Sequence, residues 1–143
     1  MGLKSLHRWE RTLYVLILVA AVLSRFVMLG DRAMSHDESI HTKFAWNLYA
    51  GEGFQHNPMM HGPLLFEATA FSYFLFGVND FTARLFVALV GVALVMTPLL
   101  FRQWLSPVGS VVAAILLLIS PSISYYSRYI RHDVLLMFTA VLL

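Results

Sequence analysis

Apolar residues along the chain are gathered into long runs, and most of the charged residues lie between these runs. Thr12–Gly30 contains one charged residue, Arg25, and neither Leu85–Phe101 nor Gln103–Ser127 contains any. Runs of about 20 largely apolar residues have the length that a helix needs to cross a hydrocarbon core of roughly 30 Å. The pattern therefore predicts an all-α integral membrane protein.

We expect about four transmembrane helices, at residues 12–29, 81–101, 108–124 and 134–143. The stretch "RQWLSPVG" between the second and the third is expected to be a tight cytoplasmic turn. The last run is about half as long as a span requires, which predicts a fragment that ends inside a helix. We therefore interpret residues 1–143 as the N-terminal part of a larger multi-pass domain.

Basic residues precede the first run, namely Lys4, Arg8 and Arg11. Positively charged flanks stay in the cytoplasm, so the N-terminus is expected there. No small-residue cleavage site follows the first run, which favours a retained signal-anchor helix over a cleaved signal peptide. The expected location is a membrane that the chain crosses several times, the plasma membrane if the protein is prokaryotic.

Two shorter helices are expected between the first and second spans, at residues 35–50 and 63–76. A helix of about 14 residues reaches only about 21 Å, which is too short to cross a bilayer. We interpret both as interfacial helices in the first extracytoplasmic loop. The second would hold its aromatic side chains at headgroup level; they are Phe66, Phe71, Tyr73, Phe74 and Phe76. With this topology Asp37 and Asp133 face the same compartment.

Composition narrows the class of protein further. Of 143 residues, 59% are hydrophobic and only 13% are charged, which excludes a disordered polymer and fits poorly with a soluble domain. The net charge is +2 and no block of lysine and arginine occurs, so no nucleic-acid partner is expected. The absence of cysteine from the sequence excludes disulfides and thiolate metal sites.

The stretch "SHDE" at residues 35–38 opens the first short helix. Ser35 and Glu38 form a capping-box pattern, in which each side chain accepts a hydrogen bond from the other residue's backbone amide. A structural role is thus a sufficient interpretation of these two residues. The cap does not require Asp37, which could act as a general base at the bilayer surface.

Four histidines fall in the first outer loop: His36, His41, His56 and His61. A helical zinc motif places its histidines four residues apart with a glutamate after the first, whereas His36 and His41 are five apart. We expect no required cofactor. A divalent metal remains the alternative, with His36 or His41 as candidate ligands beside Asp37 and Glu38.

A second polar cluster, "SRYIRHD", precedes the last run. Arg128 and Arg131 are three residues apart and share a face if the segment is helical. Together they could hold a phosphate. The alternative is a salt bridge between these arginines and Asp133. Arg25 is expected to snorkel from the first span to the outer interface.

The order of these motifs resembles a known family. A basic lead and a first span are followed by "HDE", then by "PMMHGPL" at residues 58–64 and by "FGVNDFTARL" at residues 76–85. A pair of apolar spans ending in "RHD" completes the pattern. In this order the chain resembles the N-terminal part of the GT-C membrane glycosyltransferases. The resemblance is strongest to the lineage of the protein O-mannosyltransferases and the lipid A aminoarabinose transferases.

The resemblance implies an enzyme that moves a sugar from a polyprenyl-phosphate carrier to a protein, glycan or lipid acceptor on the extracytoplasmic face. It implies a catalytic carboxylate at Asp37, with Glu38 beside it, and a second acidic site residue at Asp133. Substrate-binding candidates are Lys43, His61, Arg128 and Arg131. The alternative is a small non-catalytic membrane subunit, or an inactive fragment, whose polar loop residues only cap helices.

Overall fold

The structure is a computed structural model that describes residues 6–53 and 62–143. Within this part of the chain all regular structure is helical and there is no strand, which confirms the all-α prediction. The α-helices are α1 (Arg8–Phe26), α2 (His36–Tyr49), α3 (Leu64–Phe76), α4 (Asp80–Met96), α5 (Arg102–Ile119), α6 (Pro121–Tyr126) and α7 (Asp133–Leu142). A short 3₁₀ helix, η2 (Thr97–Leu99), extends α4.

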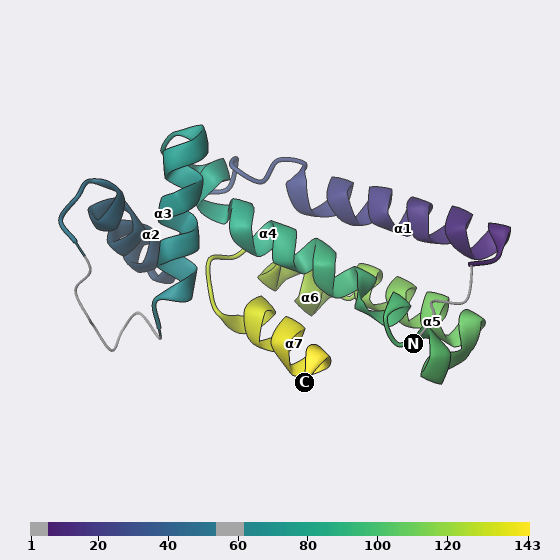
Figure 1. Cartoon of the computed structure of the whole chain (residues 1–143). Coiled ribbons are helices and arrows are strands. Elements are labelled where there is room, and N and C mark those ends of the chain that lie inside the picture. The colour runs from purple at the N-terminus through teal and green to yellow at the C-terminus, as the bar shows by residue number, and fades with distance from the viewer. Residues whose placement is uncertain (1–5, 54–61) are drawn as a thin grey trace.

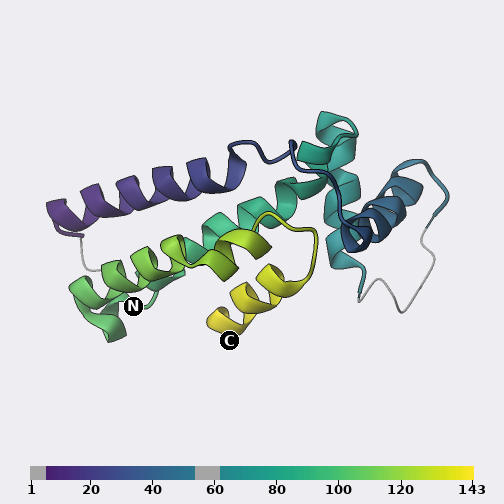
Figure 2. The same cartoon turned by 180° about the vertical axis from the view of Figure 1, so that it is seen from behind.

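Helix α4 lies at the centre of the fold. It packs against α1 and α5 along its length and against α7 on another side (Figures 1 and 2). Helices α2 and α3 pack on each other across one end of this bundle, where α3 also contacts the start of α4. Helix α2 is therefore separate from α1 rather than a continuation of it. The end covered by α2 and α3 is called the capped end below.

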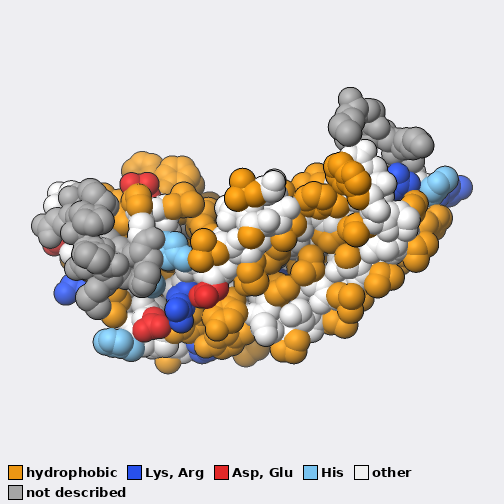
Figure 3. Space-filling view, turned by 90° about the horizontal axis from the view of Figure 1, so that it is seen from below, with side chains coloured by type: hydrophobic (Ala, Val, Ile, Leu, Met, Phe, Trp, Pro, Cys, Tyr) orange, Lys and Arg blue, Asp and Glu red, His pale blue; other side chains and the backbone are white. Residues whose placement is uncertain are grey.

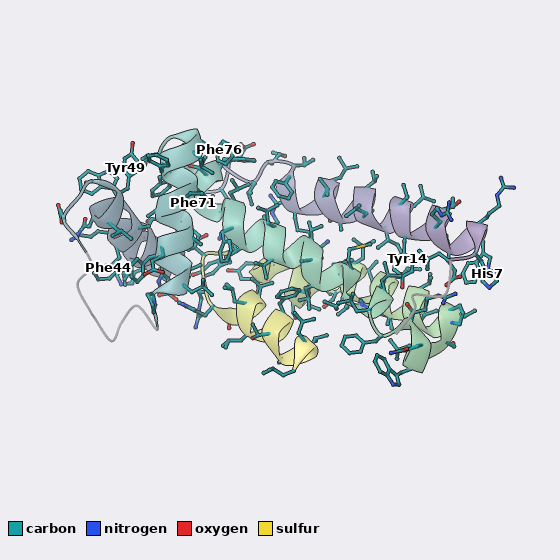
Figure 4. All side chains as sticks on the ribbon, viewed as in Figure 1. His7, Tyr14, Phe44, Tyr49, Phe71 and Phe76 are labelled. Carbon is teal, nitrogen blue, oxygen red and sulfur yellow. The ribbon has the colours of Figure 1, made fainter. Side chains whose placement is uncertain are left out.

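The buried face of α1 shows why this helix joins the bundle. Glu10, Tyr14, Ile17, Ala21 and Arg25 are buried and recur every three or four residues, so they form one stripe. At the far end from α2 and α3, Glu10 pairs with Arg102 and the Tyr14 hydroxyl hydrogen-bonds that of Ser110 (Figure 4). These contacts fix α1 to α5.

Two helical stretches are long and apolar enough to cross a membrane, Asp80–Leu99 and Arg102–Ile119. They fall on the second and third of the four expected spans. The surface supports a lipid environment, because large apolar side chains such as Leu16, Leu23 and Leu116 are exposed along α1 and α5. Figure 3 shows hydrophobic side chains spread over the bundle, while charged side chains gather toward its ends.

Some helix boundaries differ from the expected ones, because a capping box sets the start of α1 and a proline interrupts the third expected span. Helix α1 begins at Arg8, because His7 and Glu10 form a capping box there. The expected span at 108–124 is interrupted at Ser120, which precedes Pro121 and adopts an extended conformation that proline favours in its predecessor. The expected turn "RQWLSPVG" contains one helical turn, at residues 102–105, and then a break at Ser106, where φ is 65°, before the main part of α5.

The aromatic residues of α3 divide between its two faces. Phe66 and Tyr73 are each only 3% exposed and belong to the core shared by α2, α3 and α4. These two side chains therefore do not face lipid, because residues seven apart share a helix face and this face packs inward. Phe71, Phe74 and Phe76 are exposed, and their place at headgroup level stays a prediction.

Gly91 allows α4 to approach the segment that follows α6. A Cβ atom at Gly91 would lie 2.3 Å from both Cβ and Oγ of Ser127, a buried residue. We expect Gly91→Ala to lower the free energy of unfolding by about 1–3 kcal/mol, because the added methyl group overpacks this contact. Thermal unfolding in detergent measures the effect.

Gly109→Ala is the matched control, since the nearest atom to its Cβ would be Ser106 Oγ at an ordinary 3.4 Å. This variant should keep or slightly raise the stability, because alanine favours helix by roughly 0.5–1 kcal/mol. Equal stability of the two variants would contradict the close approach at Gly91.

Candidate functional site

A buried carboxylate organises the capped end of the bundle. Glu38, in the first turn of α2, is fully buried, and so is Arg84 in the second turn of α4. Arg84 Nε donates to Glu38 Oε1 at 3.0 Å and Arg84 Nη2 to Oε2 at 3.3 Å. The same guanidinium donates through Nη1 to the carbonyl of Leu29 at 3.0 Å. This two-point ion pair locks α2 to α4.

Three further groups complete the shell of Glu38. Arg32 Nη2 lies 2.9 Å from each carboxylate oxygen. The backbone amides of Ser35 and Ile130 donate to the carboxylate at 3.1 Å and 3.3 Å. Glu38 therefore joins four segments, namely the loop after α1, helix α2, helix α4 and the loop before α7. Because the side chain is buried and saturated with donors, it has the geometry of a structural anchor.

Electrostatics keeps this anchor ionised. Burial alone would raise the pKa of the Glu38 carboxyl. The hydrogen bonds from Arg84 and from the Ser35 amide, with the charges of Arg84 and Arg32, outweigh burial and hold the pKa below its ordinary value. The pair is thus a stable part of the folded chain at neutral pH.

The predicted capping box is present. The Ser35 hydroxyl accepts from the Glu38 amide at 3.4 Å, and the Glu38 side chain accepts from the Ser35 amide. The Ser35 hydroxyl also forms a 2.6 Å hydrogen bond with the Tyr129 hydroxyl. The start of α2 is therefore fixed to the "SRYIRHD" loop.

Two carboxylates from distant segments meet on the exposed side of this anchor. Arg131 Nε lies 3.2 Å from Asp133 Oδ2, and Arg131 Nη1 lies 3.7 Å from Asp37 Oδ2. The side chains of Asp37, Arg131 and Asp133 are 51%, 45% and 37% exposed, although the Oδ2 atom of Asp133 is itself buried. The sequence-predicted residues Asp37 and Asp133 thus lie at the same end of the bundle, on either side of one arginine.

Arg128 is used differently from Arg131. Its Nη1 and Nη2 donate to the carbonyls of Ser24 and Met28 at 2.9 Å and 3.0 Å. These carbonyls lie at and just beyond the C-terminal end of α1, where intrahelical donors run out. The guanidinium therefore caps α1, and the predicted phosphate contact would compete with this cap.

Arg25 does not snorkel to the interface, and this expectation is wrong. Its side chain is fully buried, and Nη1 donates to Ser24 Oγ at 2.7 Å and to the Leu118 carbonyl at 3.4 Å. The reason is its register, because Arg25 continues the buried stripe of α1. Its guanidinium lies at the C-terminal end of α5, where a cation is favourable.

The histidines do not gather into a metal site in the part of the chain that the structure describes. His36 is exposed, whereas His41 is buried and its ring lies 5.7 Å from that of His132 in an edge-to-face contact. Residues 6–53 and 62–143 contain no group of three His, Cys, Asp or Glu side chains that could hold a metal ion. His56 and His61 lie outside the described residues.

A comparison of the chain with models of protein families shows which family it belongs to. The model of the dolichyl-phosphate-mannose-protein mannosyltransferase family matches residues 32–142, which is more than half of the chain. The chain belongs to this family. Comparisons with curated proteins and with solved structures gave no significant match.

Membership of the mannosyltransferase family confirms the resemblance to the GT-C glycosyltransferases. The family is embedded in membranes and uses a polyprenyl-phosphate sugar as donor and a protein as acceptor. The matched region begins at Arg32 and includes Asp37, Glu38, Arg131 and Asp133. Asp37, Glu38 and Asp133 therefore all fall inside the region that matches the mannosyltransferase family.

Sequence reasoning missed the two partners of Glu38. Arg84 had a partial signal, because an arginine within an apolar helix needs a buried partner, but the sequence does not show that Glu38 is that partner. Arg32 had no such signal in the sequence. Its guanidinium lies over the rings of Tyr129 and Tyr125, at 5.2 Å and 5.9 Å from their centroids, which only the fold reveals.

Proposed function

We propose that this mannosyltransferase-family chain transfers a sugar from a polyprenyl-phosphate carrier to an acceptor hydroxyl at the extracytoplasmic membrane face, with inversion at the anomeric carbon. The observation that carries the proposal is the convergence of Asp37 and Asp133 on Arg131 at the capped end. Family membership supports the donor class. The accessible carboxylates support acid–base chemistry at this end.

Asp37 is the proposed general base. It takes the proton from the acceptor hydroxyl, whose oxygen then forms a bond to the anomeric carbon of the sugar. The bond between that carbon and the phosphate oxygen breaks, and the bonding electrons leave with the carrier phosphate. A single displacement of this kind inverts the anomeric centre.

Arg131 is the proposed cation for the leaving phosphate. Of the three candidates, Arg128 caps α1 and Lys43 lies in a groove on another face of α2, whereas Arg131 contacts Asp37 itself. A guanidinium matches the geometry of a phosphate. Asp133 would orient Arg131. The guanidinium of Arg131 would then offset the negative charge that develops on the phosphate.

Glu38 is proposed as a positioning residue rather than a base. It holds the amide of Ile130, which is next to Arg131, and it opens the helix that carries Asp37. The positions of Asp37 and Arg131 therefore both depend on the buried carboxylate of Glu38.

We further propose that α1 and α7 also cross the membrane, with α2 and α3 at the extracytoplasmic interface and the N-terminus in the cytoplasm.

Sealed vesicles of defined orientation test the proposed reaction and its face together. The chain as its gene encodes it is supplied with a radiolabelled polyprenyl-phosphate mannose and with a serine- and threonine-containing peptide that cannot cross membranes. We expect labelled peptide only in right-side-out vesicles, with an anomeric configuration opposite to that of the donor. Vesicles from cells that lack the gene are the control.

Three results would contradict the proposal in different ways. Retention of configuration would exclude a single displacement. Product in inside-out vesicles alone would reverse the proposed face. Absence of labelled peptide in both orientations would favour the non-catalytic subunit.

A further inference from the structure

A groove lies on the side of α2 that faces away from Asp37. Its volume is about 430 Å³, and it is bounded by α2 and by the turn between α3 and α4. The lining residues are Met34, Ser39, Thr42, Lys43, Trp46, Tyr73, Val78, Asn79 and Asp80. Trp46 is nine residues from Asp37, which corresponds to about two and a half helical turns. The two side chains therefore point to opposite sides of α2. The groove is therefore separate from the carboxylates of the transfer site.

The Tyr73 hydroxyl is a donor that has no partner among the described residues. The Tyr73 side chain lines the groove and is only 3% exposed, its ring packing edge-to-face on Tyr49 with centroids 6.2 Å apart. Burial, and then the charge of Asp80, raises the pKa of this hydroxyl to about 12. It therefore stays protonated at neutral pH and can donate a hydrogen bond to a bound acceptor.

Two opposite charges line the same groove without pairing with each other. Neither Lys43 nor Asp80 takes part in an ion pair in the described part of the chain. Asn79 uses its side-chain oxygen to cap α4, which leaves its amide group to donate. The groove thus offers an ammonium, two neutral donors and a carboxylate. A ligand that satisfies all of them carries both an anionic and a cationic group.

The rim of the groove is apolar. Trp46 and Val78 line it and are 47% and 48% exposed, and Phe76 and Phe81 on either side of the turn are also exposed. An indole face attracts a cation, and exposed aromatic residues suit the boundary between headgroups and acyl chains. The polar floor and the apolar rim together match a molecule with a charged head and hydrocarbon tails.

We infer that this groove binds the headgroup of a zwitterionic phospholipid of the phosphatidylethanolamine type. Lys43 and the Tyr73 hydroxyl contact the phosphate, and Asp80 and Trp46 contact the ammonium group. The acyl chains pass over Val78 and Phe81. Such a lipid would hold α2 and the start of α4 at a fixed depth in the membrane, and its binding does not depend on sugar transfer.

Native mass spectrometry of the detergent-purified chain tests the inference. Phosphatidylethanolamine, phosphatidylcholine and phosphatidylglycerol with identical acyl chains are compared. We expect phosphatidylethanolamine to bind about tenfold more tightly than phosphatidylglycerol, because only the former offers an ammonium group to Asp80. Phosphatidylcholine should be intermediate, since its quaternary ammonium can contact Trp46 but cannot donate a hydrogen bond.

Variants assign the contacts. Tyr73→Phe and Lys43→Gln should each weaken binding of all three lipids by about tenfold, since each removes a phosphate contact. Asp80→Asn should abolish the preference for phosphatidylethanolamine over phosphatidylglycerol. Glu52→Gln is the matched control, because Glu52 is exposed and lies outside the groove. Tyr73→Phe should unfold at the same temperature as the parent without lipid, because the hydroxyl has no partner to lose.

Equal affinity of the parent chain for phosphatidylethanolamine and phosphatidylglycerol would overturn the inference. So would unchanged affinities in Tyr73→Phe, Lys43→Gln and Asp80→Asn. Displacement of the lipid by a serine-containing peptide, with peptide binding lost in Tyr73→Phe, would assign the groove to an acceptor instead. These readouts do not involve transfer, so they stand apart from any failure of the proposed function.

Discussion

Asp37→Asn should lower the rate of sugar transfer by about 10²-fold or more, the range expected when a general base is lost. Asparagine has the size of aspartate and still accepts a hydrogen bond, but it cannot take a proton from the acceptor hydroxyl. The fold should be retained, because Asp37 is half exposed and its one ion pair with a described residue, Arg131, is long at 3.7 Å. Exposed pairs of this kind contribute about 0–1 kcal/mol to stability.

The measurement is transfer from polyprenyl-phosphate mannose in detergent, with thermal unfolding recorded on the same samples. Asp31→Asn is the matched control, since Asp31 is exposed and has no ion pair in the described part of the chain. Ser35→Ala should show the opposite pattern, with a loss of about 1 kcal/mol of stability and only a modest loss of transfer. Near-normal transfer by Asp37→Asn would indicate that "SHDE" has only a structural role, as the start of α2.

Glu38→Gln should lower the free energy of unfolding by about 3–5 kcal/mol, the cost of leaving one partner of a buried ion pair unpaired. The substitution keeps the shape of the side chain but removes the charge that compensates Arg84, which is fully buried. Transfer should fall with it, because Glu38 holds both the start of α2 and the amide next to Arg131. Chemical unfolding in detergent measures the loss.

The same variant should change the dependence of stability on pH. The folded-state pKa of Glu38 lies below its ordinary value of 4.5. Its contribution is therefore fully present above about pH 4.5 and is lost as the pH falls through the lowered value. Glu38→Gln should remove this part of the acid sensitivity, so the stability difference from the parent chain narrows at low pH.

A double variant separates positioning from catalysis. Glu38→Leu combined with Arg84→Leu should recover much of the stability that Glu38→Gln loses, because replacing a whole buried ion pair by apolar residues is often neutral. Recovery of part of the transfer activity would show that Glu38 acts through the fold. Full stability of Glu38→Gln together with lost transfer would instead identify Glu38 as a residue of the chemical step.

Local patterns were enough to predict the helices at the capped end. Helices α2 and α3 begin and end within one residue of the expected ranges, because a capping box, a proline and glycines mark their ends. Gly77, for example, ends α3 with φ of 82°, a conformation that glycine adopts without strain. Helix α5 was harder to predict, since no local pattern shows whether a Ser–Pro step makes a turn or a kink.

The carboxylates of the candidate site could be named from the sequence, but their partners could not. Asp37 could be named because the capping box leaves it without a structural task, and Asp133 because the family resemblance implies a second acidic residue in the next outer loop. The use of Arg128 as a cap on α1 and of Arg84 as the partner of Glu38 depends on contacts across 104 and 46 residues of sequence. Periodicity carries no information about such pairings, because it describes only one helix at a time.

The long separation of these partners matters while the chain is being synthesised. Arg102 follows its partner Glu10 by 92 residues. A ribosome adds about 5–20 residues per second, so Glu10 waits roughly 5–20 seconds for that contact. Arg128, the second anchor of α1, is made later still. A chain that stops before residue 128 would therefore lack the cap that Arg128 places on the C-terminal end of α1, while α1 could still pack along α4 and α5.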